Sequence, residues 1–337
     1  MHYFVTGHTG FKGAWLVYLL RSSGHTVSGY SLDPIPGSLF EKCSMQTMFV
    51  HDFRADIRDL RSLEQAISTA KPDVLIHMAA QPLVREGYRD PAGTFQTNVD
   101  GTLNVLRASQ NTSSVQAQVI VTTDKVYKNK NQRIGYKESD ELGGDDPYSA
   151  SKSMADILTQ SWIKSVKCPP TAIARAGNVI GGGDVSADRL IPDLIKAYSN
   201  SEVPKLRYPN AVRPWQHVLD CLSGYLKLVD YLIEGGRETT WNFGPNENEF
   251  KKVSEVADIV AKLWNMKTAW LADTTENPHE AELLALDSGK ARNLLKWRDK
   301  YDFETSVIKT SRWYEDVVGG SSAHQITQRA TEEFLNL

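Results

Sequence analysis

The stretch YFVTGHTGFKGAWLVYLLRS, residues 3–22, decides the fold. It opens with the apolar run Tyr3–Thr6, which is typical of a strand buried on both faces of a sheet. A glycine-rich turn then leads into the apolar helical pattern of Phe11–Ser22. A strand, a GxxGxxG turn and a helix in direct succession indicate a dinucleotide-binding unit.

Each of the three glycines in this turn has an expected task. Gly7 permits the tight turn, Gly10 lets the backbone approach a pyrophosphate, and Gly13 lets the helix pack against the sheet. The N-terminus of the helix presents free N–H groups and the positive end of its dipole to the phosphates. The residues expected at the cofactor here are Gly7, His8, Thr9, Gly10, Phe11 and Gly13.

Strands and helices alternate through the first half of the chain, which predicts an α/β fold with a Rossmann-type doubly wound parallel sheet. Further strands are expected at Thr26–Ser31, Asp73–Met78, Val119–Thr123 and Thr171–Arg175. Helices are expected at Leu60–Thr69, with Asp59 as its cap, at Phe95–Ser109 and at Tyr148–Lys164.

The pattern loosens after about residue 178, where Gly-, Asp- and Pro-rich loops separate scattered helices. We therefore expect residues 1–178 to form the dinucleotide-binding domain with the catalytic residues. Residues 179–318 should form mainly a smaller substrate-binding lobe that is interleaved with the first domain. Residues 319–337 are interpreted as a linker and a tail, which could form one short helix and is expected to be mobile.

Composition narrows the function classes. Of the 337 residues 41% are hydrophobic and 23% charged, as in an ordinary globular protein, and the net charge of −3 argues against a nucleic-acid binder. No apolar run approaches the roughly 20 residues of a membrane span. Because a strand already begins at His2, no cleaved leader is expected. The widely spaced Cys43, Cys168 and Cys221 predict reduced thiols, no metal site and a cytoplasmic protein.

The end of the second strand is where such folds hold the adenosine ribose. Ser31 occupies the usual position of the acid, Asp33 follows two residues later, and no arginine is expected nearby to receive a 2′-phosphate. This pattern favours NAD over NADP. Asp56, followed by Ile57, could accept from the adenine amino group, although a solvated loop acid is an equal alternative.

A tyrosine and a lysine four residues apart, Tyr148 and Lys152, lie on one face of the predicted helix. Tyrosine is a poor base at neutral pH, and a neighbouring ammonium lowers its pKa. Such a pair can take a proton from a sugar hydroxyl while hydride leaves the same carbon. Thr123, at the end of a parallel strand, lies where these sheets bind ligands.

With these motifs the chain resembles the extended short-chain dehydrogenase/reductase family over residues 2–318, and within it the CDP-glucose branch of the 4,6-dehydratases. The segments that carry the resemblance are VTGHTGFKGAWL (5–16), HMAAQPLVR (77–85), NVDGT (98–102), TTDKVY (122–127), GGDDPYSASK (143–152), ARAGNVIGGGD (174–184), DRLIPD (188–193), RPWQHV (213–218) and WNFGP (241–245). The resemblance adds Ala79 and Ala80 to the expected cofactor contacts.

The resemblance implies a reaction in three phases. Tyr148, supported by Lys152, removes the proton of the 4-hydroxyl as hydride passes from C4 to NAD. Water is then eliminated across C5 and C6, and the hydride returns to C6 while C5 is reprotonated. Thr123 would hydrogen-bond O4, and Asp124 would donate a proton to the departing 6-hydroxyl.

Lys125 stands where the dTDP-glucose enzymes have the glutamate that serves as the C5 base, which argues for the CDP-glucose branch. Lysine is a base only if burial or a neighbouring cation lowers its pKa. Lys125 is therefore interpreted as the C5 acid/base, with an electrostatic stabiliser of the enolate and a structural salt bridge as open alternatives.

The diphosphate of a CDP-glucose substrate calls for arginines. Arg213 matches the phosphate-binding arginine of the family, and Arg189 and Asn178 are further substrate candidates, although an arginine in a loop is often only a surface residue. His279, followed by Glu280, lies in a stretch that resembles a pocket-closing loop.

Other residues of the matching segments are expected to be structural. Asn98 should support the active-site strands, and Trp215, Trp241 and Trp297 should pack in the core. The helices at Phe95–Ser109 and Tyr148–Lys164 form a subunit interface in the enzymes that the chain resembles, which predicts a homodimer or a dimer of dimers.

Two other functions remain open. A nucleotide-sugar 4-epimerase shares the glycine loop, the Tyr-Lys pair and the arginine, but it has no use for Asp124 and Lys125. A non-enzymatic binding module of the same fold is the second alternative, and the intact catalytic pattern argues against it.

Overall fold

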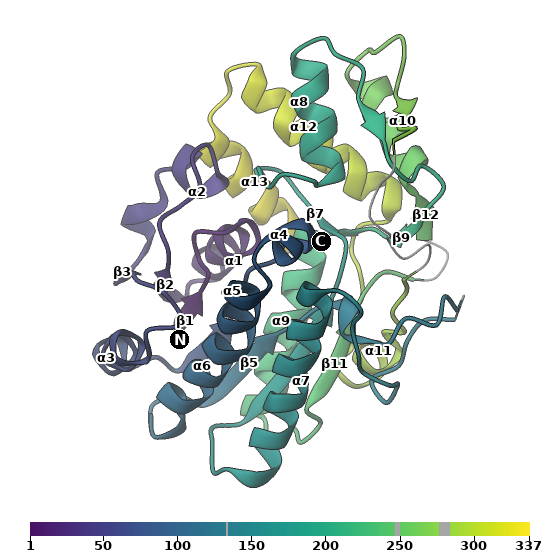
Figure 1. Ribbon diagram of the computed structural model, residues 1–337. Coiled ribbons are helices and arrows are strands. Elements are labelled where there is room, and N and C mark those ends of the chain that lie inside the picture. The colour runs from purple at the N-terminus through teal and green to yellow at the C-terminus, as the bar shows by residue number, and fades with distance from the viewer. Residues whose placement is uncertain (133, 247–249, 276–283) are drawn as a thin grey trace.

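The computed structural model describes residues 1–132, 134–246, 250–275 and 284–337. Its centre is a sheet of seven parallel strands in the order β11-β6-β5-β4-β1-β2-β3 (Figure 1). The strands are β1 (His2–Thr6), β2 (Thr26–Ser31), β3 (Asp52–Arg54), β4 (Val74–His77), β5 (Ala117–Val121), β6 (Thr171–Ala176) and β11 (Thr240–Phe243). The order reverses between β1 and β4, and such a switch point opens a ligand crevice at the carboxyl ends of the strands. The predicted doubly wound fold is confirmed.

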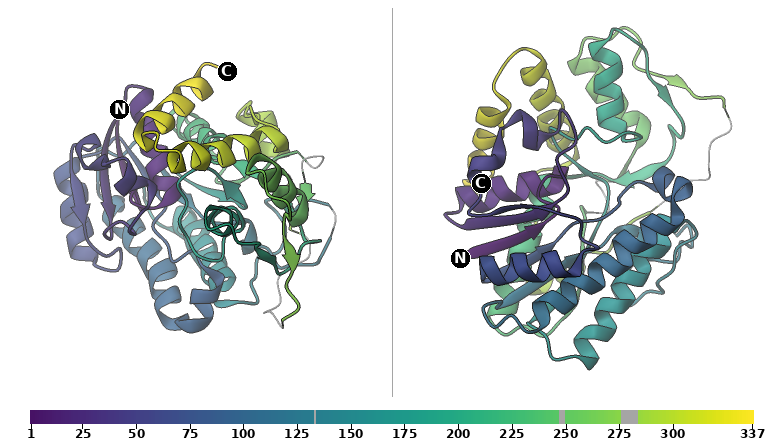
Figure 2. Two further views of the ribbon diagram at one scale, coloured as in Figure 1. Left: turned by 90° about the horizontal axis from the view of Figure 1, so that it is seen from above. Right: turned by 60° about the vertical axis from the view of Figure 1, so that its left-hand side comes forward.

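Helices cover both faces of the sheet (Figure 2). Along β1, Tyr3 and Val5 point into one apolar core and Phe4 into the other, because successive side chains of a strand alternate between its faces. The first face carries α1 (Phe11–Ser22) and α9 (Val218–Ile233). The second carries α3 (Leu60–Ala70), α6 (Gly101–Gln110) and α7 (Pro147–Ser165), with the short α4 (Val84–Arg89) and α5 (Pro91–Phe95) beside them.

The expected elements of the first half are present, with shifted ends. Asp59 caps α3 as predicted, accepting from the N–H of Ser62. The helix expected at Phe95–Ser109 consists of α5, a π turn at Gln96–Asp100 and α6. Helix α7 begins one residue early, at Pro147, because proline suits the first helical position and Asp146 caps it.

Segment 179–318 forms the upper lobe of Figure 1, but it also gives α9, β11 and α11 (Gly289–Leu294) to the sheet unit. The helices of the lobe are α8 (Leu190–Ser199), α10 (Val253–Leu263) and α12 (Phe303–Val318). Its strand pairs are β8 (Lys205–Leu206) with β13 (Leu271–Ala272), β9 (Val212–Pro214) with β12 (Phe250–Lys252), and β7 (Val179–Ile180) with β10 (Gln216–His217). Between β2 and β3 lie α2 (Leu39–Lys42) and a 3₁₀ turn at Met45–Met48.

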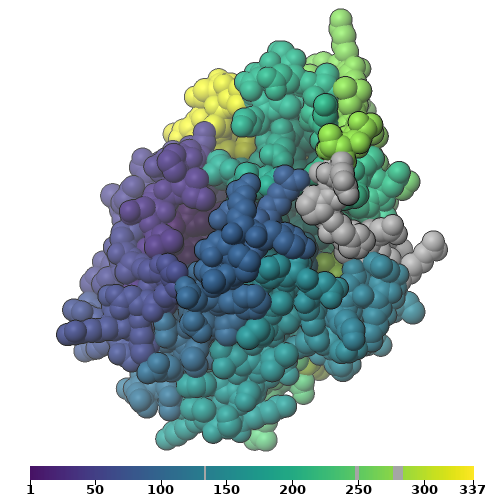
Figure 3. Space-filling model, viewed as in Figure 1, coloured from purple at the N-terminus to yellow at the C-terminus, as the bar shows by residue number. Residues whose placement is uncertain are grey.

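The tail forms one helix, α13 (Ala323–Leu335), but the expectation that it is mobile is wrong. The helix packs against α1 and α12, and Figure 3 shows the yellow C-terminal residues lying against the rest of the molecule. His324 shares a 2.5 Å hydrogen bond with Tyr18 of α1, the indole of Trp313 donates to Thr327 at 2.9 Å, and Phe334 is buried. A packed face therefore holds the end of the chain in place.

Several smaller expectations can be checked against the fold. Trp215, Trp241 and Trp297 are buried in the main core, as predicted. Within the described ranges the three cysteines are free thiols, and no helix there is long and apolar enough to cross a membrane.

Candidate active site

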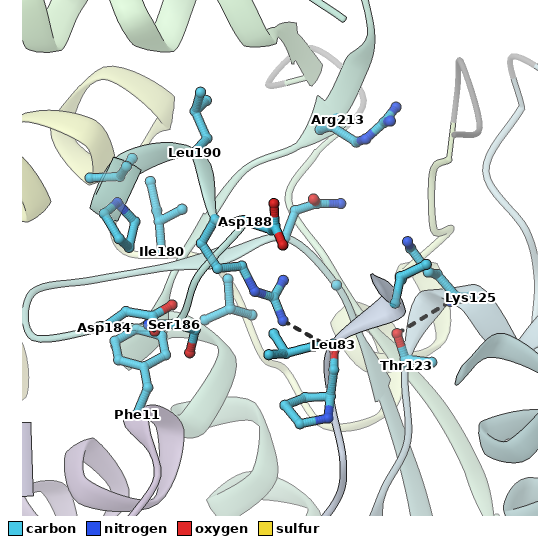
Figure 4. A pocket seen from close by; sticks show the side chains of 18 of the residues that line it. Phe11, Leu83, Thr123, Lys125, Ile180, Asp184, Ser186, Asp188, Leu190 and Arg213 are labelled. Atoms are coloured by element: carbon cyan, nitrogen blue, oxygen red, sulfur yellow. Dashed lines mark hydrogen bonds between the residues drawn. The ribbon is translucent and has the colours of Figure 1, made fainter. Parts of the chain in front are cut away.

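A pocket of about 450 Å³ lies at the carboxyl ends of the central strands, between the sheet unit and the lobe (Figure 4). Its walls bring together residues of the glycine loop, the TTDKVY segment, helix α7 and the lobe. The predicted site residues that line it are Gly7, Phe11, Gly13, Ala80, Thr123, Asp124, Lys125, Tyr148, Lys152, Asn178, Arg189 and Arg213.

The glycine loop fits the pyrophosphate of a dinucleotide. Gly7 has a φ of +76°, and a Cβ there would lie 2.8 Å from the N of Ala79. A Cβ on Gly13 would lie 2.2 Å from the carbonyl oxygen of Gly7, so the helix can begin this close to the loop only with glycine. A Cβ on Gly10 would lie 3.3 Å from the carbonyl oxygen of Gly7, and among the described residues no side chain caps α1. The first N–H groups of the helix thus remain available to an anion.

Two other loop residues serve the protein itself. The buried imidazole of His8 shares a 2.8 Å hydrogen bond with Asp52 and packs against Phe40 and Phe49. Burial lowers the pKa of His8. Only the backbone of His8 is thus free to approach a cofactor. Thr9 shares a 2.8 Å hydrogen bond with the hydroxyl of Ser31, which ties the loop to the end of β2.

The residues expected around the adenosine, Ser31, Asp33, Asp56 and Ile57, lie outside the lining of this pocket as the described residues define it. Asp33 is exposed just after β2. The carboxylate of Asp56 accepts from Arg58 Nη2 at 2.6 Å, and this bond holds the pKa of Asp56 below its usual value. The side chain of Ile57 is buried in the second core beneath Gly101.

The expectation that no arginine lies near the ribose end is wrong. Strand β3 places Arg54 beside Ser31, where its guanidinium donates to the carbonyl oxygen of Leu32 at 3.3 Å. The arginine was missed because the residues are 23 positions apart and meet only through the pairing of β2 with β3. Arg54 is paired with Asp52 at 2.7 Å and lies over the ring of Phe40.

The Tyr-Lys pair is placed by the first turns of α7. Lys152 is buried, and its ammonium donates to the carbonyl oxygen of Val121 at 2.9 Å. Burial, and to a smaller extent the charge of Lys12, lowers the pKa of Lys152 to about 8, and Asp156 opposes the shift. Burial also raises the pKa of Tyr148, against the effect of the Thr123 hydroxyl. In the protein alone the phenol is therefore protonated at neutral pH.

The TTDKVY segment leaves β5 and turns directly into the pocket. The hydroxyl of Thr123 donates to Asp124 Oδ1 at 2.9 Å and accepts from the N–H of Lys125 at 3.4 Å. Asp124 is only 2% exposed, and it also accepts from the amide of Asn178 at 3.4 Å. It packs on Gly177, where a Cβ would collide with its carboxylate. Lys125 lies beside Thr123 in Figure 4.

Two of the predicted substrate residues approach from the opposite wall. Arg213 on β9 donates to the carbonyl oxygen of Val212 at 3.0 Å, and Figure 4 shows it reaching from the lobe. Arg189 donates to the carbonyl oxygen of Pro82 at 3.5 Å, across the pocket. His279 and Glu280 lie outside the described residues.

Asn98 takes a structural place between two segments of the site. Its amide donates to the carbonyl oxygen of Gln81 at 3.1 Å and to Ser151 Oγ at 2.9 Å, and its oxygen accepts from the N–H of Gln81. The residue is buried, and it joins the AQPLVR stretch to helix α7.

Sequence reasoning missed a cluster of charges in the pocket wall. Asp188 Oδ1 lies 3.1 Å from Arg85 Nη1 and 3.2 Å from Arg207 Nη1, and Asp188 has a φ of +62°. Arg85 and Asp188 belong to the segments HMAAQPLVR and DRLIPD, which carry the family resemblance, but the resemblance assigned them no role. Arg207 lies in none of these segments, so the sequence offered no reason to select it.

Lys12 was also missed, although it stands inside the glycine motif. It lines the pocket, and its ammonium donates to the hydroxyl of the buried Tyr225 on α9 at 2.7 Å. The motif alone does not show where the side chain at this variable position points.

The comparisons with known proteins agree with this geometry. Residues 4–310 match the family model of GDP-mannose 4,6 dehydratase. The chain is 38% identical over 344 residues to a CDP-glucose 4,6-dehydratase of Salmonella typhimurium, covering 99% of this chain and 96% of the relative. It is 27% identical to a probable dTDP-glucose 4,6-dehydratase of Sinorhizobium fredii, with 93% of each chain covered.

Solved structures show the same fold. A dTDP-glucose 4,6-dehydratase from Bacillus anthracis in complex with NAD is 25% identical, with a TM-score of 0.78 and coverage of 94% of this chain and 97% of that one. A UDP-glucose 4-epimerase from Thermotoga maritima with UDP-glucose is 20% identical, with a TM-score of 0.83 and coverage of 94% and 100%. The second likeness is one of fold alone.

The glycine loop, the Tyr-Lys pair and the Thr-Asp-Lys segment stand in one pocket, in a chain that matches the family model over most of its length. The chain therefore belongs to the GDP-mannose 4,6 dehydratase family of extended short-chain dehydrogenases/reductases.

Proposed function

We propose that the protein is a lyase that dehydrates CDP-glucose to CDP-4-keto-6-deoxyglucose with NAD, a step of deoxysugar biosynthesis. The observation that carries the proposal is the convergence of Thr123, Asp124 and Lys125 with Tyr148 and Lys152 in one pocket. The 38% identity to a CDP-glucose 4,6-dehydratase over nearly the whole chain supports this choice of substrate.

The glycine loop would hold the pyrophosphate of NAD, and Lys152 and Tyr148 stand where its reactive end would lie. When bound, NAD supplies reversible hydride exchange with the sugar and a positive charge. The ammonium of Lys152 favours the phenolate of Tyr148, whose pKa is raised by burial in the protein alone. Tyr148 can then take the proton of the 4-hydroxyl, while the hydroxyl of Thr123 orients O4.

The elimination falls to the other two residues of the segment. A ketone at C4 acidifies the proton on C5, and Lys125 takes that proton if it is neutral when the sugar binds. Asp124, acting as the neutral acid, donates a proton to the departing 6-hydroxyl, which leaves as water, and Asp124 becomes a carboxylate. Its burial beside Gly177 and Asn178 fixes its carboxyl group in one place, as a proton donor to one oxygen requires.

The opposite wall suits the diphosphate. Arg213 and Arg189 bring guanidinium groups to the pocket from the lobe side, and guanidinium pairs well with phosphate oxygens. Asn178 has a φ of +48° and directs its amide toward Asp124. Asn178 would therefore orient Asp124 rather than the nucleotide.

A nucleotide-sugar 4-epimerase needs the Tyr-Lys pair but not a second acid/base pair. Asp124 and Lys125 follow Thr123 directly into the pocket. This arrangement favours dehydration over epimerisation.

We further propose a homodimer or a dimer of dimers. On the outer face of α7, Met154 and Ile157 are 48% and 52% exposed. Exposed apolar side chains that lie together on one helix often mark a contact surface.

The proposed function is tested by incubating the protein and NAD with CDP-, dTDP-, GDP- and UDP-hexoses and identifying the products by mass and NMR. We expect a product 18 mass units lighter from CDP-glucose, with a 4-keto group and a 6-methyl group. A product of unchanged mass with inverted C4 would identify an epimerase.

A further inference from the structure

We propose that Asp156 and Arg175 are positioning residues, whose buried ion pair sets the Thr123–Lys125 segment against the helix that carries Tyr148 and Lys152. This inference rests on the proposed function, because it concerns how the two catalytic groups are held relative to each other.

The pair has bidentate geometry. Arg175 Nε lies 2.8 Å from Asp156 Oδ2, and Nη2 lies 2.7 Å from Oδ1. Both side chains are fully buried. A buried ion pair commonly adds little net stability, since desolvation offsets the attraction. The presence of this pair beside an active site thus calls for a reason other than stability.

The pair contacts both ends of the catalytic segment. On one side, the hydroxyl of Thr122, just before Thr123, donates to Asp156 Oδ2 at 3.1 Å. On the other side, Arg175 Nη1 donates to the hydroxyl of Tyr127 at 2.7 Å. Residues 123–126 are therefore held at both ends by one ion pair.

The same pair connects the segment with helix α7. Asp156 lies one turn after Lys152, so the carboxylate that holds Thr122 is fixed to the helix of the Tyr-Lys pair. Arg175 lies on β6, and strand β6 pairs with β5, from which the segment emerges.

The far end of the network reaches β11. The hydroxyl of Tyr127 donates to Asn242 Oδ1 at 2.7 Å, and the amide of Asn242 donates to the carbonyl oxygen of Tyr136 at 2.8 Å. The guanidinium of Arg175 also lies over the ring of Tyr127. The side chains of this network, Asp156, Arg175, Tyr127 and Asn242, are all buried. Such networks fix geometry when each member is satisfied.

The network should affect the two chemical steps unequally. The ammonium of Lys152 is held directly by the carbonyl oxygen of Val121, and Asp156 acts on it only as a nearby charge. Thr123, Asp124 and Lys125 lie between the anchors at Thr122 and Tyr127, and two of these three residues act only in the elimination. A loosened network should therefore slow the elimination more than the oxidation at C4, and substrate affinity should change little because Arg213 and Arg189 are not involved.

The test uses Tyr127→Phe, which keeps the ring but removes the hydroxyl that joins Arg175 to Asn242. Tyr136→Phe is the matched control, because this ring stacks on Tyr127 at 5.1 Å while its hydroxyl accepts from the N–H of Lys130, away from the ion pair. Single turnovers with CDP-glucose are followed by reduced-nicotinamide absorbance and by deuterium entry at C5 in D₂O. Separate steady-state measurements give kcat and KM.

Tyr127→Phe should lower kcat about 10-fold or more, since small misplacements of catalytic groups are costly, with KM within about twofold. Deuterium entry should slow more than formation of reduced nicotinamide, and Tyr136→Phe should behave as the unmodified protein. Equal slowing of both steps, or an unchanged kcat, would overturn the inference. Arg175→Lys cannot bind Asp156 in the same bidentate manner, so it should also slow deuterium entry more than formation of reduced nicotinamide. If Arg175→Lys does not fold, the result for Tyr127→Phe decides the test.

The two proposals fail in different ways. If the unmodified protein forms no dehydrated product from any nucleotide hexose, the proposed function fails. If it does and the two steps respond equally in Tyr127→Phe, only the positioning role fails.

Discussion

The hydroxyl of Thr123 donates its hydrogen bond to the carboxylate of Asp124, its neighbour in the chain, at 2.9 Å. These two residues are proposed to act on different oxygens of the sugar, yet without substrate they satisfy each other. The single hydroxyl proton of Thr123 cannot be donated to Asp124 and to O4 of the sugar at the same time. Binding of O4 should therefore turn the Thr123 hydroxyl toward the sugar and leave the carboxyl group of Asp124 free for the 6-hydroxyl.

Replacing Tyr148 by phenylalanine should reduce turnover of CDP-glucose by about 10² or more, the usual effect of losing an acid/base group. The ring remains, so the thermal unfolding midpoint should stay close to that of the unmodified protein. Turnover is measured by the product's 4-keto absorbance. Near-normal turnover in a folded variant would remove Tyr148 from its role.

Lys125→Met keeps most of the bulk of the side chain and removes its amine. If Lys125 is the C5 base, the variant should still oxidise C4, seen as reduced-nicotinamide absorbance that does not decay, and should stop before elimination. If the lysine only stabilises the enolate, elimination should slow without stopping. In D₂O the unmodified enzyme should introduce deuterium at C5, and product without it would contradict the dehydratase assignment.

The cofactor preference should favour NAD, although Arg54 lies beside Ser31. Asp52 pairs with this arginine at 2.7 Å and so reduces its attraction for a 2′-phosphate. Full activity is expected with NAD, and reduced cofactor should not accumulate in stoichiometric amount. Titration of both cofactors under one condition measures the preference, and tighter binding of NADP would show that Arg54 remains available.

The buried Lys152 should make stability depend on pH in the cofactor-free protein. Its pKa of about 8 lies below the ordinary 10.5, so the unfolded chain binds more protons between these values. The free energy of unfolding should therefore rise with pH through this window, by about 3 kcal/mol for this group.

Lys152→Met provides the reference for this effect, because it lacks the titrating amine and other groups cancel in the comparison. Denaturant unfolding at pH 7 and pH 10 should show the unmodified protein gaining stability relative to the variant as pH rises. A constant difference between the two proteins would mean that the lysine is not perturbed.

The assembly prediction concerns α7. Met154→Lys together with Ile157→Glu should convert a dimer into monomers at micromolar concentration, since charges would be buried in the contact. Leu294→Glu, at a residue that is 54% exposed on α11, is the control. Light scattering gives the mass of each, and a monomeric unmodified protein would contradict the proposal.

Local signals allowed much of the sheet unit to be predicted. Thr26–Ser31 was expected with the bounds that the structure shows, and Asp146 with Pro147 explains the start of α7. The shared helix face of Tyr148 and Lys152 followed from helical periodicity. In these cases the physical cause lies within a few residues of the element.

Contacts between distant segments could not be predicted in this way. Arg54 reaches Ser31 only through strand pairing, and Arg175 meets Tyr127 and Asp156 across 48 and 19 positions. His8 stands in the cofactor motif, but its side chain turns into the core toward Asp52. A motif fixes the path of the backbone and leaves the direction of its variable side chains to the tertiary structure.

The tail was misjudged for a related reason. Its Gly-Gly-Ser-Ser start suggests flexibility, and much of its buried face is threonine, as at Thr327 and Thr331, rather than large apolar residues. These hydroxyls bond to carbonyl oxygens of their own helix, at Ala323 and Thr327, so they can be buried without loss. Hydrophobicity of the sequence alone does not predict that a helix face rich in threonine will be buried.

The family model ends at residue 310, whereas α13 continues the core to Phe334 and holds Tyr18 of the helix that begins at the glycine loop. The stretch that matches the family model and the unit that folds thus have different ends in this chain. Shortening the protein at residue 310 should leave the outer side of α1 uncovered, and we expect the damage to reach the other end of that helix as weaker binding of the cofactor. A purification tag is accordingly safer at a distance from α13, beyond a spacer.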